Sequence, residues 1–218
     1  YKNGKPQEGQ ARYTGPDGSV WTGFFKNGII NGLGMTIFGP GQWHGDKYEG
    51  QFKDGNYNGQ GTYTFSDGTI KKGEWRKNKL EGYGIIIYGS GQWHGDKFES
   101  QFKDGKANGQ GTWTFPDGHV YIGNFKNNEY HGQGTYIFAN GNQYVGKFRN
   151  GEYHGHGTYT YGSGGKSGES YVGEWKDGKS WNGLYYFASG KIRGTYSEGE
   201  WCEGCQPKSD PKDSGGAI

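Results

Sequence analysis

The chain has 218 residues, with 47 glycines, 17% aromatic residues, 29% hydrophobic residues of all kinds and a formal net charge of +2. The low net charge gives no support for a nucleic-acid-binding protein, and no run of roughly 18 apolar residues exists that could form a transmembrane helix. Glycine-rich disordered chains are poor in aromatic residues, so this composition predicts a thin, ordered structure held together by rings.

An internal repeat organises most of the chain. Residues 1–20 form a partial repeat, after which the sequence recurs with a period of 23 or 27 residues, and a second partial repeat covers 197–204. We number the full repeats 1 to 7 by their opening residues, which are Trp21, Tyr48, Lys71, Phe98, Tyr121, Tyr144 and Tyr171. The array is therefore predicted over 1–205, and the polar segment 206–218, which lacks any aromatic residue, is expected to be a disordered tail.

Each repeat has the pattern of a β-hairpin. Positions 1, 3 and 5 and positions 12, 14, 16 and 18 of a repeat alternate with polar residues, which predicts strands with an aromatic-and-glycine face and a polar face. Position 5 is aromatic in all full repeats: Phe25, Phe52, Trp75, Phe102, Phe125, Phe148 and Trp175. Segments such as "KDG" and "PDG" are typical turns, so no helix is expected in 21–196.

The heptad "GQWHGDK" occurs at 41–47 and again at 91–97. It ends repeats 1 and 3, where shorter repeats carry "SDGTI" or "PDGHV". Residues 21–70 match 71–120 at 27 of 50 positions, so duplication of a two-repeat block explains the identical heptads. We interpret them as lengthened turns, with Trp43 and Trp93 covering neighbouring rings.

The segments "YEGQFKDG", "YHGQGTYIF" and "YVGEWKDG" resemble the MORN repeat (membrane occupation and recognition nexus) over nearly the whole of 1–204. Lys71 and Ser100 depart from the pattern at an opening aromatic and at a glycine. The resemblance implies an all-β fold, an elongated single-layer antiparallel array of stacked β-hairpins, forming an open twisted sheet with a groove. It also implies a non-catalytic scaffold in a cytoskeletal or ciliary (axonemal) assembly, and a cytoplasmic, cytoskeletal or ciliary location.

The aromatic face is the predicted binding groove for a protein partner, as a peptide or a helix, because exposed aromatic patches often mark binding sites. Position 5 is invariably aromatic and is assigned to packing between repeats, whereas positions 1 and 16 vary and are expected to be less buried. Repeats 4 to 6 are the most regular, and their predicted groove residues are Phe98, Trp113, Phe115, Tyr121, Tyr136, Phe138, Tyr144, Tyr159 and Tyr161.

A cation stands at position 6 of every full repeat: Lys26, Lys53, Arg76, Lys103, Lys126, Arg149 and Lys176. Such a ladder could bind an anionic membrane containing phosphoinositide, which makes a membrane-surface adaptor the alternative function. The simpler interpretation is that each cation lies over a neighbouring ring and keeps its charge in water. A glycan-binding module is a third alternative, because sugars also stack on aromatic rows.

Enzymatic chemistry is not predicted. The pairs His44/Asp46 and His94/Asp96 lie on glycine-rich turns, and a catalytic triad would need a nucleophile and an enclosed pocket beside them. No cofactor and no nucleic-acid partner are expected.

Metal binding is not predicted either. Cys202 and Cys205 form a CxxC half-site without a second pair, and an exposed dithiol in a turn is the expected arrangement. His131 and His154 share a position in successive repeats, about 9–10 Å apart if their strands are two ladder spacings apart, which is too far for one ion.

Overall fold

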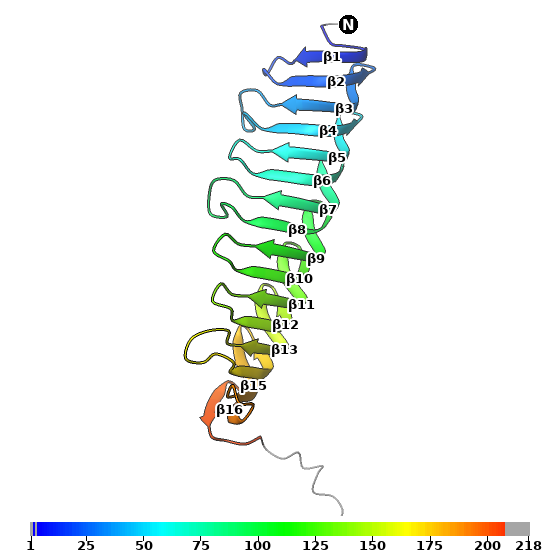
Figure 1. The fold of residues 1–218 in the computed structure, drawn as a ribbon. Helices are drawn as coiled ribbons and strands as arrows, with labels where there is room; N and C mark the ends of the chain where they lie inside the picture. Colours follow the sequence, from blue (N-terminus) through cyan, green and yellow to red (C-terminus); the bar gives the residue numbers. More distant parts are fainter. Residues whose placement is uncertain (1, 3, 208–218) are drawn as a thin grey trace, which may run out of the picture. The chain divides into compact units, whose positions relative to one another are not determined.

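The computed structural model describes residue 2 and residues 4–207 (Figure 1). Strands and turns account for its secondary structure, and the predicted absence of helix in 21–196 is confirmed. The predicted tail lies outside the described residues from position 208 onward.

The chain divides into two compact units. The N-terminal unit comprises 1–118 and 124–129, and the C-terminal unit comprises 119–123 and 130–218. Strands of the N-terminal unit are β1 (Glu8–Thr14), β2 (Val20–Lys26), β3 (Ile29–Ile37), β4 (Lys47–Lys53), β5 (Asn56–Thr64), β6 (Ile70–Arg76), β7 (Lys79–Ile87), β8 (Lys97–Lys103) and β9 (Lys106–Thr114). Strand β10 (Val120–Lys126) contributes residues to both units.

Strands of the C-terminal unit are β11 (Glu129–Ile137), β12 (Gln143–Arg149), β13 (Glu152–Thr160), β14 (Ser170–Lys176), β15 (Lys179–Tyr186), β16 (Ile192–Ser197) and β17 (Glu200–Glu203). Within each unit these strands pair in an antiparallel sheet. From β1 to β9, and again from β11 to β17, each strand pairs with the strand just before it and just after it in the chain. The fold is therefore the predicted all-β array of stacked hairpins.

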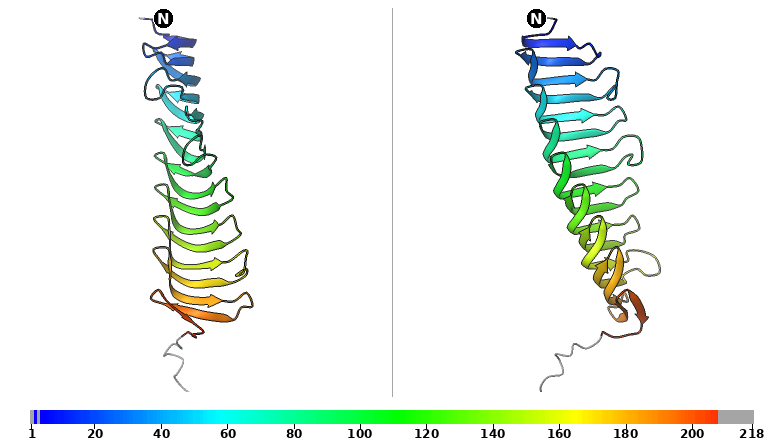
Figure 2. Two further views of the ribbon diagram at one scale, coloured as in Figure 1. Left: turned by 90° about the vertical axis from the view of Figure 1, so that its left-hand side faces the viewer. Right: turned by 180° about the vertical axis from the view of Figure 1, so that it is seen from behind.

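Tight turns close the hairpins because their residues accept positive φ. Asp54 and Gly55 join β4 to β5 with φ values of 50° and 77°, as a type I′ turn requires at both central residues. Longer connections, such as 38–46 and 88–96, join one hairpin to the next. In the N-terminal unit, drawn from blue to green in Figure 2, they lie at the edge opposite the tight turns.

A bulge interrupts the second strand of most hairpins. Gly146 of β12 pairs with Gly157 of β13 and Phe148 pairs with Tyr153, so residues 154–156 of β13 lie opposite Lys147 alone. Such extra residues bend a strand and increase its twist. The curved strands are visible within each unit in Figure 2. We call the sheet face that carries positions 1, 5, 10, 16 and 18 the inner face, and the other the outer face.

Position 5 forms the centre of the core, as predicted. Its seven rings are exposed by no more than 8%. Each packs against the opening ring of the preceding repeat where that ring is a tyrosine: Trp175 meets Tyr144 at 5.2 Å between ring centroids, with an interplanar angle of 88°. This edge-to-face geometry is the favourable one for aromatic pairs, and it joins successive repeats.

An opening tyrosine lies across a pair of glycines. Gly146 and Gly157 pair across β12 and β13, and a Cβ added to Gly146 would lie 2.6 Å from the hydroxyl oxygen of Tyr144. That hydroxyl donates a 2.9 Å hydrogen bond to the carbonyl of Lys147, and Tyr153 stacks on the ring at 3.8 Å. The glycines therefore provide the space in which the tyrosine ring is buried.

Repeat 4 differs from this arrangement at two positions, the opening residue and one of the two glycines. Ser100 stands where a glycine is usual, and the opening residue Phe98 lacks a hydroxyl. The Ser100 hydroxyl donates instead to the carbonyl of Gln101, at 3.2 Å. The serine thus supplies the hydrogen bond that the opening tyrosine makes in other repeats.

The outer face is less polar than predicted. Leu33 and Tyr83 in the N-terminal unit are 69% and 55% exposed there. Val145 and Val172 in the C-terminal unit are also exposed. The predicted polar face therefore also carries exposed apolar side chains.

Candidate binding face

The inner-face rings fall into two classes of burial. The opening rings Phe98, Tyr121 and Tyr144 are exposed by 2%, 0% and 0%, so the expectation that position 1 is less buried and free for a ligand is wrong. Tyr121 and Tyr144 cover a glycine pair, and Phe98 packs against Phe125 at 4.8 Å between ring centroids. The remaining predicted groove rings are half-buried: Trp113, Phe115, Tyr136, Phe138, Tyr159 and Tyr161.

The predicted groove residues are also distributed between the two units. Phe98, Trp113 and Phe115 lie in the N-terminal unit, and the other six lie in the C-terminal unit. Within repeat 6, the rings of Tyr159 and Tyr161 are 5.0 Å apart, so positions 16 and 18 form a continuous aromatic strip along one strand.

A polar residue stands two places before each full repeat, and it bonds to the position-16 ring of that repeat where such a ring is present. Periodicity alone did not identify these residues. We call these the link residues: Ser19, Asp46, Thr69, Asp96, His119, Asn142 and Glu169. All except His119 are buried. Buried polar groups need hydrogen-bond partners, and the structure supplies them from the following hairpin.

Asp46 shows the arrangement most clearly. Its Oδ2 accepts a 2.8 Å hydrogen bond from the hydroxyl of Tyr63, and its Oδ1 accepts another of 2.8 Å from the backbone N–H of Ser66. Asp96 likewise accepts from the indole N–H of Trp113 at 2.8 Å. Each carboxylate therefore fixes the orientation of a ring on the inner face.

Other side chains make the same link in the C-terminal unit. Asn142 donates to the hydroxyl of Tyr159 at 2.8 Å, and Glu169 accepts from the hydroxyl of Tyr185 at 2.8 Å. Arg193 lies 3.1 Å from Glu169 and 5.7 Å from the centroid of the Tyr185 ring, so an ion pair and a cation–π contact complete that site.

The inner face is hollowed between the rings. In the N-terminal unit one hollow of about 500 Å³ is lined by Trp21, Thr36, Phe38, Trp43, Phe52, Gly55, Tyr57, Tyr63 and Asn78. A second, of about 200 Å³, lies beside Lys71 and Ile86. The C-terminal unit has one of about 200 Å³ beside Tyr136 and Phe148. Aromatic hollows of this kind suit apolar side chains of a partner.

The two heptads contain no assembled catalytic pair. His44 and His94 are exposed, whereas Asp46 and Asp96 are buried as link residues. His94 Nδ1 lies 2.9 Å from the carbonyl of Gly89. The aspartates thus belong to the packing of the turns.

The two heptad tryptophans are largely exposed, although each lies near another ring. Trp43 is 6.0 Å from Phe38 and Trp93 is 5.7 Å from Trp113, between ring centroids. The prediction that they cover neighbouring rings is confirmed for these contacts.

The position-6 cations are all exposed. Arg76 pairs with Glu81 at 2.9 Å and Arg149 with Asp177 at 3.3 Å. Lys176 Nζ lies 4.2 Å from the centroid of the Trp181 ring. The interpretation that a position-6 cation lies over a ring therefore describes Lys176, whereas the two arginines are engaged with carboxylates.

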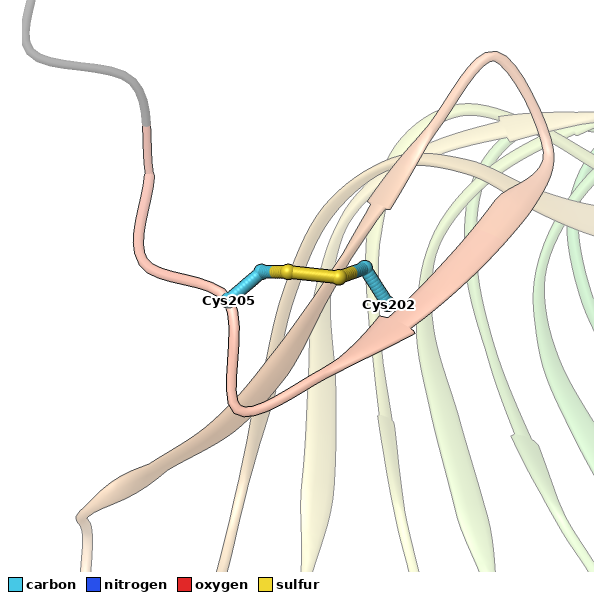
Figure 3. Close-up of a disulfide and its surroundings, with 2 residues drawn as sticks. All are labelled: Cys202 and Cys205. Carbon is cyan, nitrogen blue, oxygen red and sulfur yellow. A yellow bond between two sulfur atoms is a disulfide. The ribbon is translucent and has the colours of Figure 1, made fainter.

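Cys202 and Cys205 form a disulfide across the end of β17 (Figure 3). The expected free dithiol is therefore oxidised in the structure, and its sulfurs do not form a metal half-site. Over the described part of the chain, no group of three or more His, Cys, Asp or Glu side chains is placed to hold a metal ion. His131 and His154 are half-buried at the turn edge.

Burial raises the pKa of several inner-face tyrosines, among them Tyr48, Tyr121 and Tyr144. The pKa of Tyr171 rises to about 12 because its phenol is desolvated. Desolvation also raises the pKa of Tyr63, and its bond to the Asp46 carboxylate raises it further. These phenols are therefore held in their neutral form, in which Tyr63, Tyr144 and Tyr185 donate the hydrogen bonds described above.

Comparison with protein families matches the MORN repeat in eight segments, at residues 1–20, 21–43, 48–70, 72–93, 98–120, 121–143, 144–166 and 171–192. No curated protein matches the chain. No helix in the described residues has the length and apolar character needed to cross a membrane.

Two solved structures show a weak similarity to this chain. One is the SAS-4 (dCPAP) TCP domain of Drosophila melanogaster in complex with a proline-rich motif of Ana2 (dSTIL), at 13% identity and a TM-score of 0.41, covering 86% of this chain and 89% of that one. The other is a mutant TCP10 domain of Danio rerio CPAP, at 13% identity and a TM-score of 0.23, covering 86% and 99%. Likeness at this level indicates no function for the chain.

Proposed function

The chain belongs to the MORN-repeat family, and from that premise we propose that it is a non-catalytic scaffold that binds partner proteins through its inner face. The family supports a cytoskeletal or ciliary assembly as its setting. We place the contact at the half-buried rings of positions 16 and 18 in repeats 4 to 6 and at the hollows of the inner face. The buried opening rings Phe98, Tyr121 and Tyr144 support this surface from below.

The proposal rests on the incomplete burial of these rings. Phe138 and Tyr161, for example, are only half-buried, although large rings contribute most when they are fully covered. The link residues also orient the position-16 rings in advance, which lowers the ordering cost of binding. A partner that covers such pre-oriented rings gains apolar contact without rearranging them.

The same geometry argues against catalysis. A catalytic histidine needs an orienting acid and an adjacent nucleophile, and the aspartates of both heptads are engaged with Tyr63 and Trp113. The heptads therefore contribute to the scaffold.

A matched pair of photo-crosslinking proteins tests the proposal. p-Benzoylphenylalanine replaces Phe138 on the inner face in one protein and Val145, 47% exposed on the outer face, in the other. Both are illuminated in extract of the source cells, and adducts are identified by mass spectrometry. We expect a specific protein adduct from the inner-face probe. Adducts from the outer-face probe alone would contradict the proposal.

A further inference from the structure

Repeat 1 lacks a ring that other repeats supply. Position 16 is Tyr63, Trp113, Tyr136 and Tyr159 in repeats 2, 4, 5 and 6, but it is Thr36 in repeat 1. In repeat 2, the Tyr63 ring lies 4.5 Å from Phe65 at position 18 and 6.2 Å from Trp75 at position 5 of the next repeat. A ring at position 16 therefore fills the space between these two neighbours.

The corresponding space in repeat 1 is open. Its position-18 ring and the next position-5 ring are Phe38 and Phe52, and both line the hollow of about 500 Å³ together with Thr36. The rings of Trp21, Trp43, Tyr57 and Tyr63 also line it. The hollow is thus lined by Phe38 and Phe52, the counterparts of Phe65 and Trp75, which flank Tyr63 in repeat 2.

Thr36 also presents an unsatisfied polar group. Its side chain is only 2% exposed, and its Oγ1 is buried without a hydrogen-bond partner among the described residues. A buried hydroxyl without a partner is unfavourable. Because the threonine itself lines the hollow, rotation about χ1 to another staggered rotamer would move Oγ1 to the position now held by Cγ2 or by Hβ and turn the hydroxyl toward an entering group.

Repeat 3 provides an internal contrast. It also lacks a position-16 ring, but Ile86 has no polar atom, and Lys71 lies beside it with Nζ 5.0 Å from the centroid of the Phe65 ring. The hollow there is only about 200 Å³. The large aromatic hollow with a polar floor thus distinguishes repeat 1 from the other ring-deficient repeat.

We propose that the hollow beside Thr36 binds a tyrosine side chain of a protein partner, whose ring lies between Phe38 and Phe52 and whose hydroxyl bonds to Oγ1 of Thr36. The inference rests on the proposed function and specifies one anchor for it. Trp43, 55% exposed and 6.0 Å from Phe38, covers one side of the bound ring. The partner thus provides a tyrosine ring where repeats 2, 5 and 6 have their own tyrosine at position 16.

The first test uses p-cresol, the side-chain analogue of tyrosine, with the full chain. Indole N–H resonances of Trp21 and Trp43 are followed by NMR during titration. Wild type should show saturable shifts, and Thr36→Tyr should weaken binding at least tenfold, because its own ring fills the hollow. Thr36→Tyr should fold, since tyrosine occupies this position in repeats 2, 5 and 6. Equal p-cresol affinity in both proteins would overturn the proposal.

The second test isolates the hydroxyl. Wild type should prefer p-cresol to toluene by about threefold or more, a modest factor for one exchanged hydrogen bond. Thr36→Val keeps the shape of the side chain and should abolish that preference, whereas the outer-face control Thr64→Val should retain it. A preference that survives in Thr36→Val would exclude the tyrosine assignment.

The third test separates this inference from the proposed function. A partner identified by inner-face crosslinking is titrated against wild type and Thr36→Tyr. Loss of at least tenfold in affinity supports the anchor, and unchanged affinity overturns it while the scaffold proposal stands. If no inner-face partner is found although p-cresol binds as expected, the scaffold proposal fails and so does the assignment of a partner tyrosine.

Discussion

The hydroxyl of Tyr63 donates a 2.8 Å hydrogen bond to Oδ2 of Asp46, which lies 17 residues earlier in the chain. The residue before the strand thereby fixes the ring near the end of the hairpin. We expect Tyr63→Phe to destabilise the protein by about 1–3 kcal/mol, because the buried carboxylate loses one of its two donors. Urea unfolding measures the effect, with Glu49→Gln, an exposed ion-pair change on β4, as the control.

A loss in Tyr63→Phe no larger than that in Glu49→Gln would show that the link residues contribute little stability.

Core rings and binding rings should respond differently to truncation. Tyr144→Ala and Phe148→Ala each remove a buried ring, and each should cost about 3–5 kcal/mol of stability. Tyr161→Ala removes a half-buried ring in the same repeat and should cost less, yet weaken partner binding by more than about 1 kcal/mol if it is an anchor. Thermal melting and partner titration together check this; a lower melting temperature for Tyr161→Ala than for Phe148→Ala would reverse the two assignments.

The Phe98 and Ser100 pair should be strongly non-additive. Phe98→Tyr alone would direct a hydroxyl at the volume of the Ser100 side chain, because a Cβ added to Gly146 in repeat 6 lies 2.6 Å from the corresponding hydroxyl of Tyr144. We expect a loss of about 1–3 kcal/mol from this overpacking. Adding Ser100→Gly should recover most of it, and a double-mutant cycle in urea measures the coupling. Additive effects would contradict the exchange of hydrogen bonds described for repeat 4.

Stability should fall at alkaline pH. The pKa of Tyr171 rises to about 12 in the folded protein, against about 10 for an unfolded chain. A raised phenol pKa means that the folded state holds its proton longer, so the contribution is complete below about pH 10 and is lost as the pH rises through the folded value. Circular dichroism and phenolate absorbance should change together; ionisation with a midpoint near 10 in a protein that stays folded would contradict this.

The position-6 cations should not bind membranes at physiological salt. Exposed cations near an anionic surface contribute about 1 kcal/mol each, and Arg76 and Arg149 are already engaged with carboxylates. We expect no sedimentation with phosphoinositide liposomes. The membrane-adaptor alternative takes precedence if two results are obtained. The protein must sediment with the liposomes, and changing Lys103, Lys126 and Arg149 to Gln must release it from them, with a larger loss of binding at low salt.

Periodicity was sufficient to predict the hairpins and the packing role of position 5, because both depend on residue types that recur in every repeat. Position 1 was misassigned because it varies. Its variation has a structural cause: where Trp21 or Lys71 opens a repeat, Ile30 or Leu80 at position 10 covers the glycine pair instead. Either position 1 or position 10 can cover the glycine pair. The residue at position 1 therefore varies among repeats although the side chain that covers the glycines is always buried.

The link residues can be recognised in the sequence only by their correlation with position 16. Where position 16 is the short Thr36 or the apolar Ile86, the link residue is Ser19 or Thr69. Where position 16 is an aromatic ring with a polar atom, the link residue is Asp, Asn, Glu or His. The link position and position 16 therefore change together from repeat to repeat. This correlation is detected only when the two positions are compared. The hydrogen bond itself requires the three-dimensional register.

Neighbour-by-neighbour strand pairing has a consequence for how each unit acquires its structure. Every ladder from β1 to β9 joins strands that follow one another in the chain. Contacts of short sequence separation require little loop closure, so nucleation can begin at any hairpin and spread in both directions. Inserting one more repeat between two hairpins would therefore add only pairings between neighbouring strands. Folding would have one more hairpin to add, but no slow step that brings distant segments together.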